Sequence, residues 1–138
     1  MYKIVKGSRY NNIKKVLLET NNVKDIINFF NDDNFNIKIE SKNFDDILKD
    51  FSRQIEENEM YYISFYDYLN NYGNIKLVNP RYNDIRGLYN GFYVIVVLYD
   101  DKSGFSYLDI CENNDQNIVH TIQFLLDYID DYDLIIEY

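Results

Sequence analysis

The sequence predicts an α+β fold, an antiparallel or mixed sheet of about five to six strands with three to four helices packed on it. Three observations predict this class. Segments of helical and strand periodicity are intermixed, one long apolar run is rich in β-branched residues, and a hairpin turn follows that run. The chain has 138 residues without a linker or repeat, so residues 1–138 are expected to form a single globular domain.

The first part of the chain predicts two strands followed by a short helix and a third strand. Residues 12–20 have strand character and are expected to pair with residues 2–5. Asn21 and Asn22 offer an N-cap for the short helix. The apolar face of this helix would carry Val23, Ile26, Ile27 and Phe30. Alternating apolar residues predict the next strand, at Phe35, Ile37 and Ile39.

A longer amphipathic helix is expected after Asn43, which can act as its N-cap, with Asp45 and Asp46 in the first turn. Its apolar stripe would be Phe44, Ile47, Leu48, Phe51 and Ile55. Charged residues cover the opposite face: Asp46, Lys49, Asp50, Arg53 and Glu57. The tyrosine-rich segment 60–72 is interpreted as a strand to Ile63 and then a short helix, and its pattern leaves open which tyrosines are buried.

The second half of the chain predicts most of the sheet. A short strand is expected at 75–78, and the apolar run 92–99 is typical of a central strand covered on both faces. The turn 100–104 would connect this run to a strand at 105–111. A helix over 115–128 should bury Ile118, Ile122, Leu125 and Ile129. Residues 134–138 are expected to close the sheet as an edge strand.

The charge of the chain is uneven. The net charge is −9, and residues 61–138 carry 12 Asp and Glu against 4 Lys and Arg. Such a surface repels phosphate backbones, which argues against direct nucleic-acid binding and favours a basic protein partner. No run approaches the ~18 apolar residues of a membrane span, and no signal peptide is evident. The protein is therefore expected in the cytoplasm of a bacterial host cell. Its surplus of Asn, Ile, Tyr, Asp and Lys, residues with AT-rich codons, indicates the low-GC genome of a bacterium, its phage or a similarly biased source.

The residues that could carry catalysis form no recognised site. A nucleophilic pair of Cys111 and His120 is conceivable, although His120 should be exposed on its helix. Glu40 and Lys42, with Asp32 and Asp33 upstream, have the residue types of a metal-dependent nuclease, but the negative charge opposes a phosphate substrate. The single cysteine excludes an internal disulfide. We therefore expect no enzymatic activity, no metal and no cofactor.

A cluster of acids and aromatics around the end of the last helix is the candidate partner-binding site. Its members are Phe124, Asp127, Tyr128, Asp130, Asp131, Tyr132 and Asp133. Carboxylates at a helix C-terminus oppose the helix dipole, at a cost of about 0.3 to 1 kcal/mol each, so stability alone does not favour them there. Tyrosine is enriched among interface hot spots. The alternative is that codon bias supplied both residue types and that the helix ends before Asp130.

These observations predict an acidic, stoichiometric inhibitor that blocks the substrate groove of a basic, nucleic-acid-acting protein. Its carboxylates would stand where phosphates bind, as in a nucleic-acid mimic. A phage anti-defence protein such as an anti-CRISPR would work in this way. An immunity protein or antitoxin that neutralises a nuclease toxin would use the same chemistry. A structural or assembly subunit, or an enzyme with an unrecognised site, remains as an alternative, and the sequence leaves the oligomeric state open.

Overall fold

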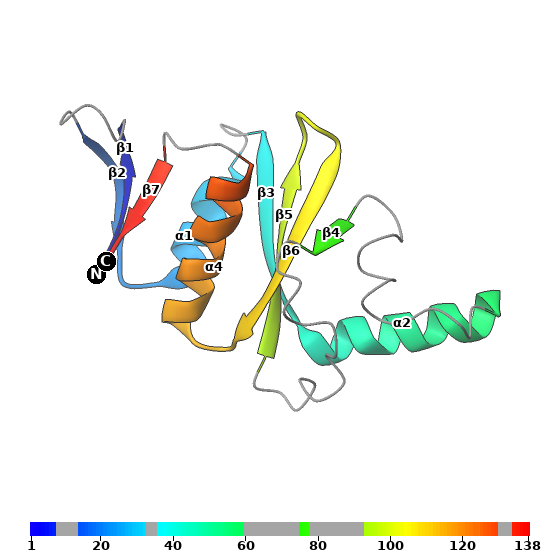
Figure 1. The fold of residues 1–138 in the computed structure, drawn as a ribbon. Coiled ribbons are helices and arrows are strands. Elements are labelled where there is room, and N and C mark those ends of the chain that lie inside the picture. Colours follow the sequence, from blue (N-terminus) through cyan, green and yellow to red (C-terminus); the bar gives the residue numbers. More distant parts are fainter. Residues whose placement is uncertain (8–13, 33–35, 60–74, 78–92, 130–133) are drawn as a thin grey trace.

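The computed structural model describes residues 1–7, 14–32, 36–59, 75–77, 93–129 and 134–138, and it confirms the α+β class (Figure 1). The strands are β1 (Tyr2–Lys6), β2 (Lys15–Thr20), β3 (Ile37–Asn43), β4 (Ile75–Leu77), β5 (Tyr93–Asp100), β6 (Phe105–Glu112) and β7 (Leu134–Glu137). The helices of this part of the chain are α1 (Val23–Asn31), α2 (Phe44–Asn58) and α4 (Asp115–Tyr128). The strand and helix predicted within Met60–Tyr72 lie outside the described residues.

The strands divide between two sheets, where the sequence analysis expected one. One sheet is antiparallel, with the order β2-β1-β7, and the other has the order β3-β5-β6-β4, in which only β4 runs parallel to its neighbour. The division arises because β7 returns to pair with β1 instead of joining the sheet formed by β3, β5 and β6. The edge position expected for 134–138 is confirmed, but in the smaller sheet.

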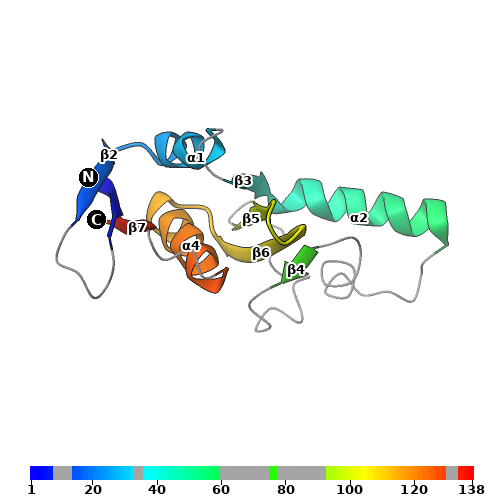
Figure 2. The same cartoon turned by 90° about the horizontal axis from the view of Figure 1, so that it is seen from above.

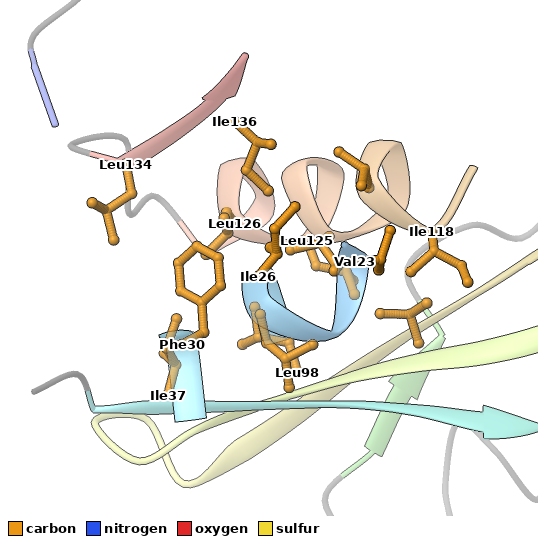
Figure 3. Packing of buried hydrophobic residues seen from close by; sticks show 14 of the residues in the cluster. Val23, Ile26, Phe30, Ile37, Leu98, Ile118, Leu125, Leu126, Leu134 and Ile136 are labelled. Atoms are coloured by element: carbon orange, nitrogen blue, oxygen red, sulfur yellow. The ribbon is translucent and has the colours of Figure 1, made fainter. Parts of the chain in front are cut away.

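Helices α1 and α4 lie side by side between the two sheets (Figures 1 and 2). The arrangement is therefore a layer of helices with a sheet on either side. A single cluster of buried apolar residues runs through all three layers, from Ile4 of β1 through Phe30 and Leu125 to Leu98 of β5. Figure 3 shows the side chains of α1 and α4 meeting between β7 and the β3–β5 pair. The two helices thus supply the core of both sheets.

Both core helices begin where the sequence predicts. The side chain of Asn22 accepts a hydrogen bond from the Lys24 backbone N–H at 3.0 Å, and Asn114 caps α4 through the Asn117 N–H at 2.9 Å. Helix α1 buries Val23, Ile26 and Phe30, as expected. Helix α4 has a wider apolar face than the predicted stripe, and its buried residues are Ile118, Val119, Thr121, Ile122, Leu125 and Leu126. Ile129, expected to be buried, is the half-buried C-cap residue.

Strand β5 has the central position that its composition predicts. Five consecutive residues, from Val94 to Leu98, are buried, so both faces of the strand are covered. The hairpin to β6 turns at Gly104, whose φ of +72° favours glycine, and Asp100 accepts a hydrogen bond from the Lys102 N–H at 3.1 Å. Helix α2 also forms where expected, and it contacts β3 and β5. No helix of the described residues is long and apolar enough to cross a membrane.

Side-chain amides cover the backbone at two strand edges. The Asn31 carboxamide accepts from the Ile39 N–H at 2.6 Å and donates to the Ile39 carbonyl at 2.8 Å, so it takes the place of a neighbouring strand on β3. The Gln123 side chain of α4 accepts from the Ile136 N–H of β7 at 2.7 Å. These contacts satisfy backbone groups that an edge strand otherwise leaves open to another chain.

Substituting Asn31 by alanine should lower the free energy of unfolding by about 1 to 3 kcal/mol, because both Ile39 groups are part-buried and would lose their partner. Urea unfolding measures the change. The control is Asn58→Ala, since Asn58 is exposed at the end of α2 and donates to Gln54 within the same helix; it should change stability by no more than about 0.5 kcal/mol. Equal effects of the two substitutions would contradict the role assigned to Asn31.

Candidate functional site

The exposed side of α4, opposite its buried face, carries the described part of the candidate site. Phe124 is 44% exposed and Tyr128 is 52% exposed, and Asp127 is also exposed. Residues three and four positions apart are neighbours on a helix surface, so Asp127 and Tyr128 both adjoin Phe124. The structure thus brings these three predicted residues together on one surface. Asp130, Asp131, Tyr132 and Asp133 lie outside the described residues.

Asp127 is oriented by a hydrogen-bonded chain that starts in the smaller sheet. Gln123 accepts from the Ile136 N–H at 2.7 Å through its Oε1 atom and donates to Asp127 Oδ1 at 3.1 Å through its Nε2 atom. Both atoms of the Gln123 side-chain amide are therefore used, and the carboxylate is tied to β7 through one intervening residue. Gln123 was not among the predicted site residues. Its spacing of four from Asp127 on a helix is the sequence signal that points to it.

Tyr128 is backed by a second tyrosine from the sheet. The ring of Tyr107, on β6, lies 5.2 Å from the ring of Tyr128, measured between centroids, with the planes tilted by 58°. Sequence reasoning missed Tyr107, although a short connection turns α4 back along β6 and brings the end of the helix near the start of the strand. Phe105, two residues before Tyr107, is 40% exposed at the same end of β6. The contact with Tyr107 limits the positions that the Tyr128 ring can adopt.

His120 lies one turn before Phe124 and is exposed, as predicted. Its ring is 4.8 Å from the ring of Tyr138, and Tyr138 in turn contacts Tyr2 at 6.2 Å. These three rings connect α4 with the smaller sheet on the side where β1 begins. The ring contact of His120 is thus with Tyr138 of the smaller sheet.

The electrostatic character of this region is acidic. The last Lys or Arg of the chain is Lys102. Residues 103–138 contain eight Asp and Glu and no Lys or Arg. No basic residue occupies the last turn of α4, where a cation would favour the helix dipole. Asp127 stands in that turn, so it is held against the dipole by its hydrogen bond with Gln123. The last turn of α4 therefore carries a negative charge without a basic residue of the same turn beside it.

The thiol considered as a nucleophile has the wrong environment for that role. Cys111 is buried in the core below α4. Burial raises the pKa of the Cys111 thiol, the hydrogen bond with Thr121 opposes this shift, and the charges of Asp109 and Glu112 add to it. Because the thiolate is the reactive form, these surroundings make Cys111 a packing residue.

The residues with nuclease character do not assemble a metal site in the described part of the chain. Lys42 pairs with Glu40 at 3.2 Å and donates to the Tyr99 hydroxyl at 3.3 Å. Burial disfavours the charged form of Lys42, but these hydrogen bonds outweigh it, so the pKa of Lys42 is raised. Asp32 is the C-cap residue of α1, and Asp33 lies outside the described residues. Among the described residues, no group of three His, Cys, Asp or Glu could hold a metal ion.

Thiol labelling tests the assignment of Cys111 to the core. With an aromatic disulfide reagent at pH 8, the folded protein should react at least about tenfold more slowly than the protein unfolded in urea, because burial restricts access and disfavours the thiolate. The urea-unfolded protein is the matched control, since it carries the same single thiol. Equal labelling rates in the folded and unfolded protein would show that Cys111 is accessible and would make it a candidate nucleophile again.

In its described part, the candidate site is one exposed surface of α4 with Phe124, Asp127 and Tyr128 on it. Gln123 holds Asp127 and Tyr107 contacts Tyr128. The surface combines a carboxylate with aromatic rings, and tyrosine is a residue type enriched among interface hot spots. Comparisons with protein-family models, curated proteins and solved structures gave no match to this chain.

Proposed function

We propose that this protein is a stoichiometric inhibitor that binds a basic, nucleic-acid-acting protein through the exposed side of α4. In this proposal the acids at the end of α4 occupy the positions of substrate phosphates in the groove of the partner. The single observation that carries it is the pairing of two exposed aromatic rings, Phe124 and Tyr128, with Asp127 in a region without Lys or Arg after Lys102.

Each part of this surface has a separate physical role in the proposal. The uneven charge steers a basic partner toward the acidic end and makes association fast and sensitive to salt. The rings supply the desolvated area from which most binding energy comes at protein interfaces. Tyr128 loses little conformational freedom on binding, since Tyr107 already restrains it. Binding of this kind needs no catalytic residue in the inhibitor.

The biological setting that we propose is the cytoplasm of a bacterial host cell. There, an anti-defence protein of a phage, such as an anti-CRISPR, would have to block a nuclease that grips nucleic acid with Lys and Arg. Carboxylates of the inhibitor would compete with phosphates for these Lys and Arg side chains directly. The captured partner would also identify the role, because a toxin nuclease would assign the protein as an immunity protein or antitoxin.

Charge reversal of the acidic end tests the proposal. Changing Asp127, Asp130, Asp131 and Asp133 together to Lys should abolish capture of the partner from a nuclease-treated host lysate, because the surface would then repel a basic groove. The wild-type protein should release one basic protein at moderate salt, which mass spectrometry identifies. Activity of that protein on nucleic acid should fall in proportion to the inhibitor added.

The matched control makes the same change of charge elsewhere. Asp46, Glu56, Glu57 and Glu59 are exposed on or just after α2, and their joint substitution by Lys should leave capture nearly intact. Circular dichroism should show that both variants remain folded. Unchanged capture by the first variant would mean that the end of α4 is not the binding surface.

A further inference from the structure

We infer that the exposed side of α4 is a recognition site for arginine, formed by the rings of Phe124 and Tyr128 together with the carboxylate of Asp127. This inference rests on the proposed function and deepens it, since it specifies which basic side chain of the partner the surface selects. The occupant is thus an arginine of the partner protein, seated against the aromatic rings.

The positions on the helix support a single binding spot. Phe124 and Tyr128 are one turn apart, and Asp127 is three positions after Phe124, so all three side chains border the same patch of the helix surface. Both rings are about half exposed, which leaves aromatic surface for a ligand to cover. A planar cation that lies against either ring is therefore close to the carboxylate.

Two contacts restrain the site before any partner arrives. Tyr107 backs the ring of Tyr128 at 5.2 Å, and Gln123 orients Asp127 through a hydrogen bond of 3.1 Å. A carboxylate has about four acceptor positions, so the bond from Gln123 does not prevent it from accepting others. Preorganisation of this kind lowers the cost of ordering side chains on binding.

The chemistry of the site favours guanidinium over ammonium. A guanidinium group is planar and weakly hydrated, stacks on aromatic rings, and presents a fixed fork of donors to a carboxylate. The ammonium group of lysine is compact and strongly hydrated, and it cannot stack in this way. The fork favours arginine at any exposed carboxylate of the chain, whereas the two rings supply the part of the preference that is specific to this site.

Charge complementarity indicates that a cation is the occupant. The chain from Ser103 to Tyr138 contains eight acidic residues and no Lys or Arg. His120, one turn before Phe124, has its ring against Tyr138. Helix α4 itself carries Asp115 and Asp127 and no Lys or Arg, so it offers negative charge to an arginine from outside.

Two labelled peptides of equal length, nona-arginine and nona-lysine, test the inference by fluorescence anisotropy on the full chain at one ionic strength. We expect the wild-type protein to bind nona-arginine about three- to tenfold more tightly than nona-lysine, from one or two exposed cation–π contacts. The double variant Phe124→Leu and Tyr128→Leu keeps apolar side chains and helix propensity but removes the rings. It should lose most of the preference for nona-arginine.

The other variants separate this inference from the proposed function. Asp127→Asn should weaken binding of both peptides, and the variant with Lys at 46, 56, 57 and 59 should keep the preference for arginine. A preference for arginine of unchanged size in the double leucine variant would overturn the inference. Equal binding of both peptides by the wild type would also overturn it. If charge reversal at 127, 130, 131 and 133 then abolishes this equal binding, the acidic surface of the proposed function still stands. Peptide binding that survives this charge reversal would overturn both.

Discussion

Helix α4 buries apolar side chains toward both sheets at once, and the arrangement of the other elements depends on this double contact. Leu125 and Leu126 belong to a cluster that also contains Leu98 of the larger sheet and Ile136 of the smaller one. Full burial of a leucine or isoleucine side chain contributes roughly 1.5 to 3 kcal/mol, so the helix ties the two sheets strongly. It has only one narrow side left for solvent, and that side carries the candidate site.

The division of roles along α4 explains why a binding surface and a stable core coexist on one short helix. The buried side is nearly all aliphatic, whereas the exposed side holds the aromatic rings and the carboxylate. Gln123 lies at the border and bonds to both sides, to Ile136 of the sheet and to Asp127 of the surface. The position of the site is thereby fixed by the same packing that stabilises the fold.

Local elements could be predicted from the sequence because their signals are local. The N-cap at Asn22, the helix Asp115–Tyr128 and the buried strand after Phe92 each follow from the spacing of a few adjacent residues. The second sheet could not be predicted, since the pairing of β7 with β1 joins residues more than a hundred positions apart. The same holds for the site: the helix spacing predicts Phe124, Asp127 and Tyr128 on one side, but Tyr107 comes from another element.

The amide contacts at Asn31 and Gln123 bear on how partner selection evolves under the proposed function. Proteins that recruit partners by strand addition are constrained by the geometry of the backbone, which single substitutions hardly change. Here the described edges of β3 and β7 are occupied by side chains of the same chain at Ile39 and Ile136. In the proposed function the partner is instead selected by side chains on the surface of α4, so its identity can be altered by single substitutions that leave the fold intact.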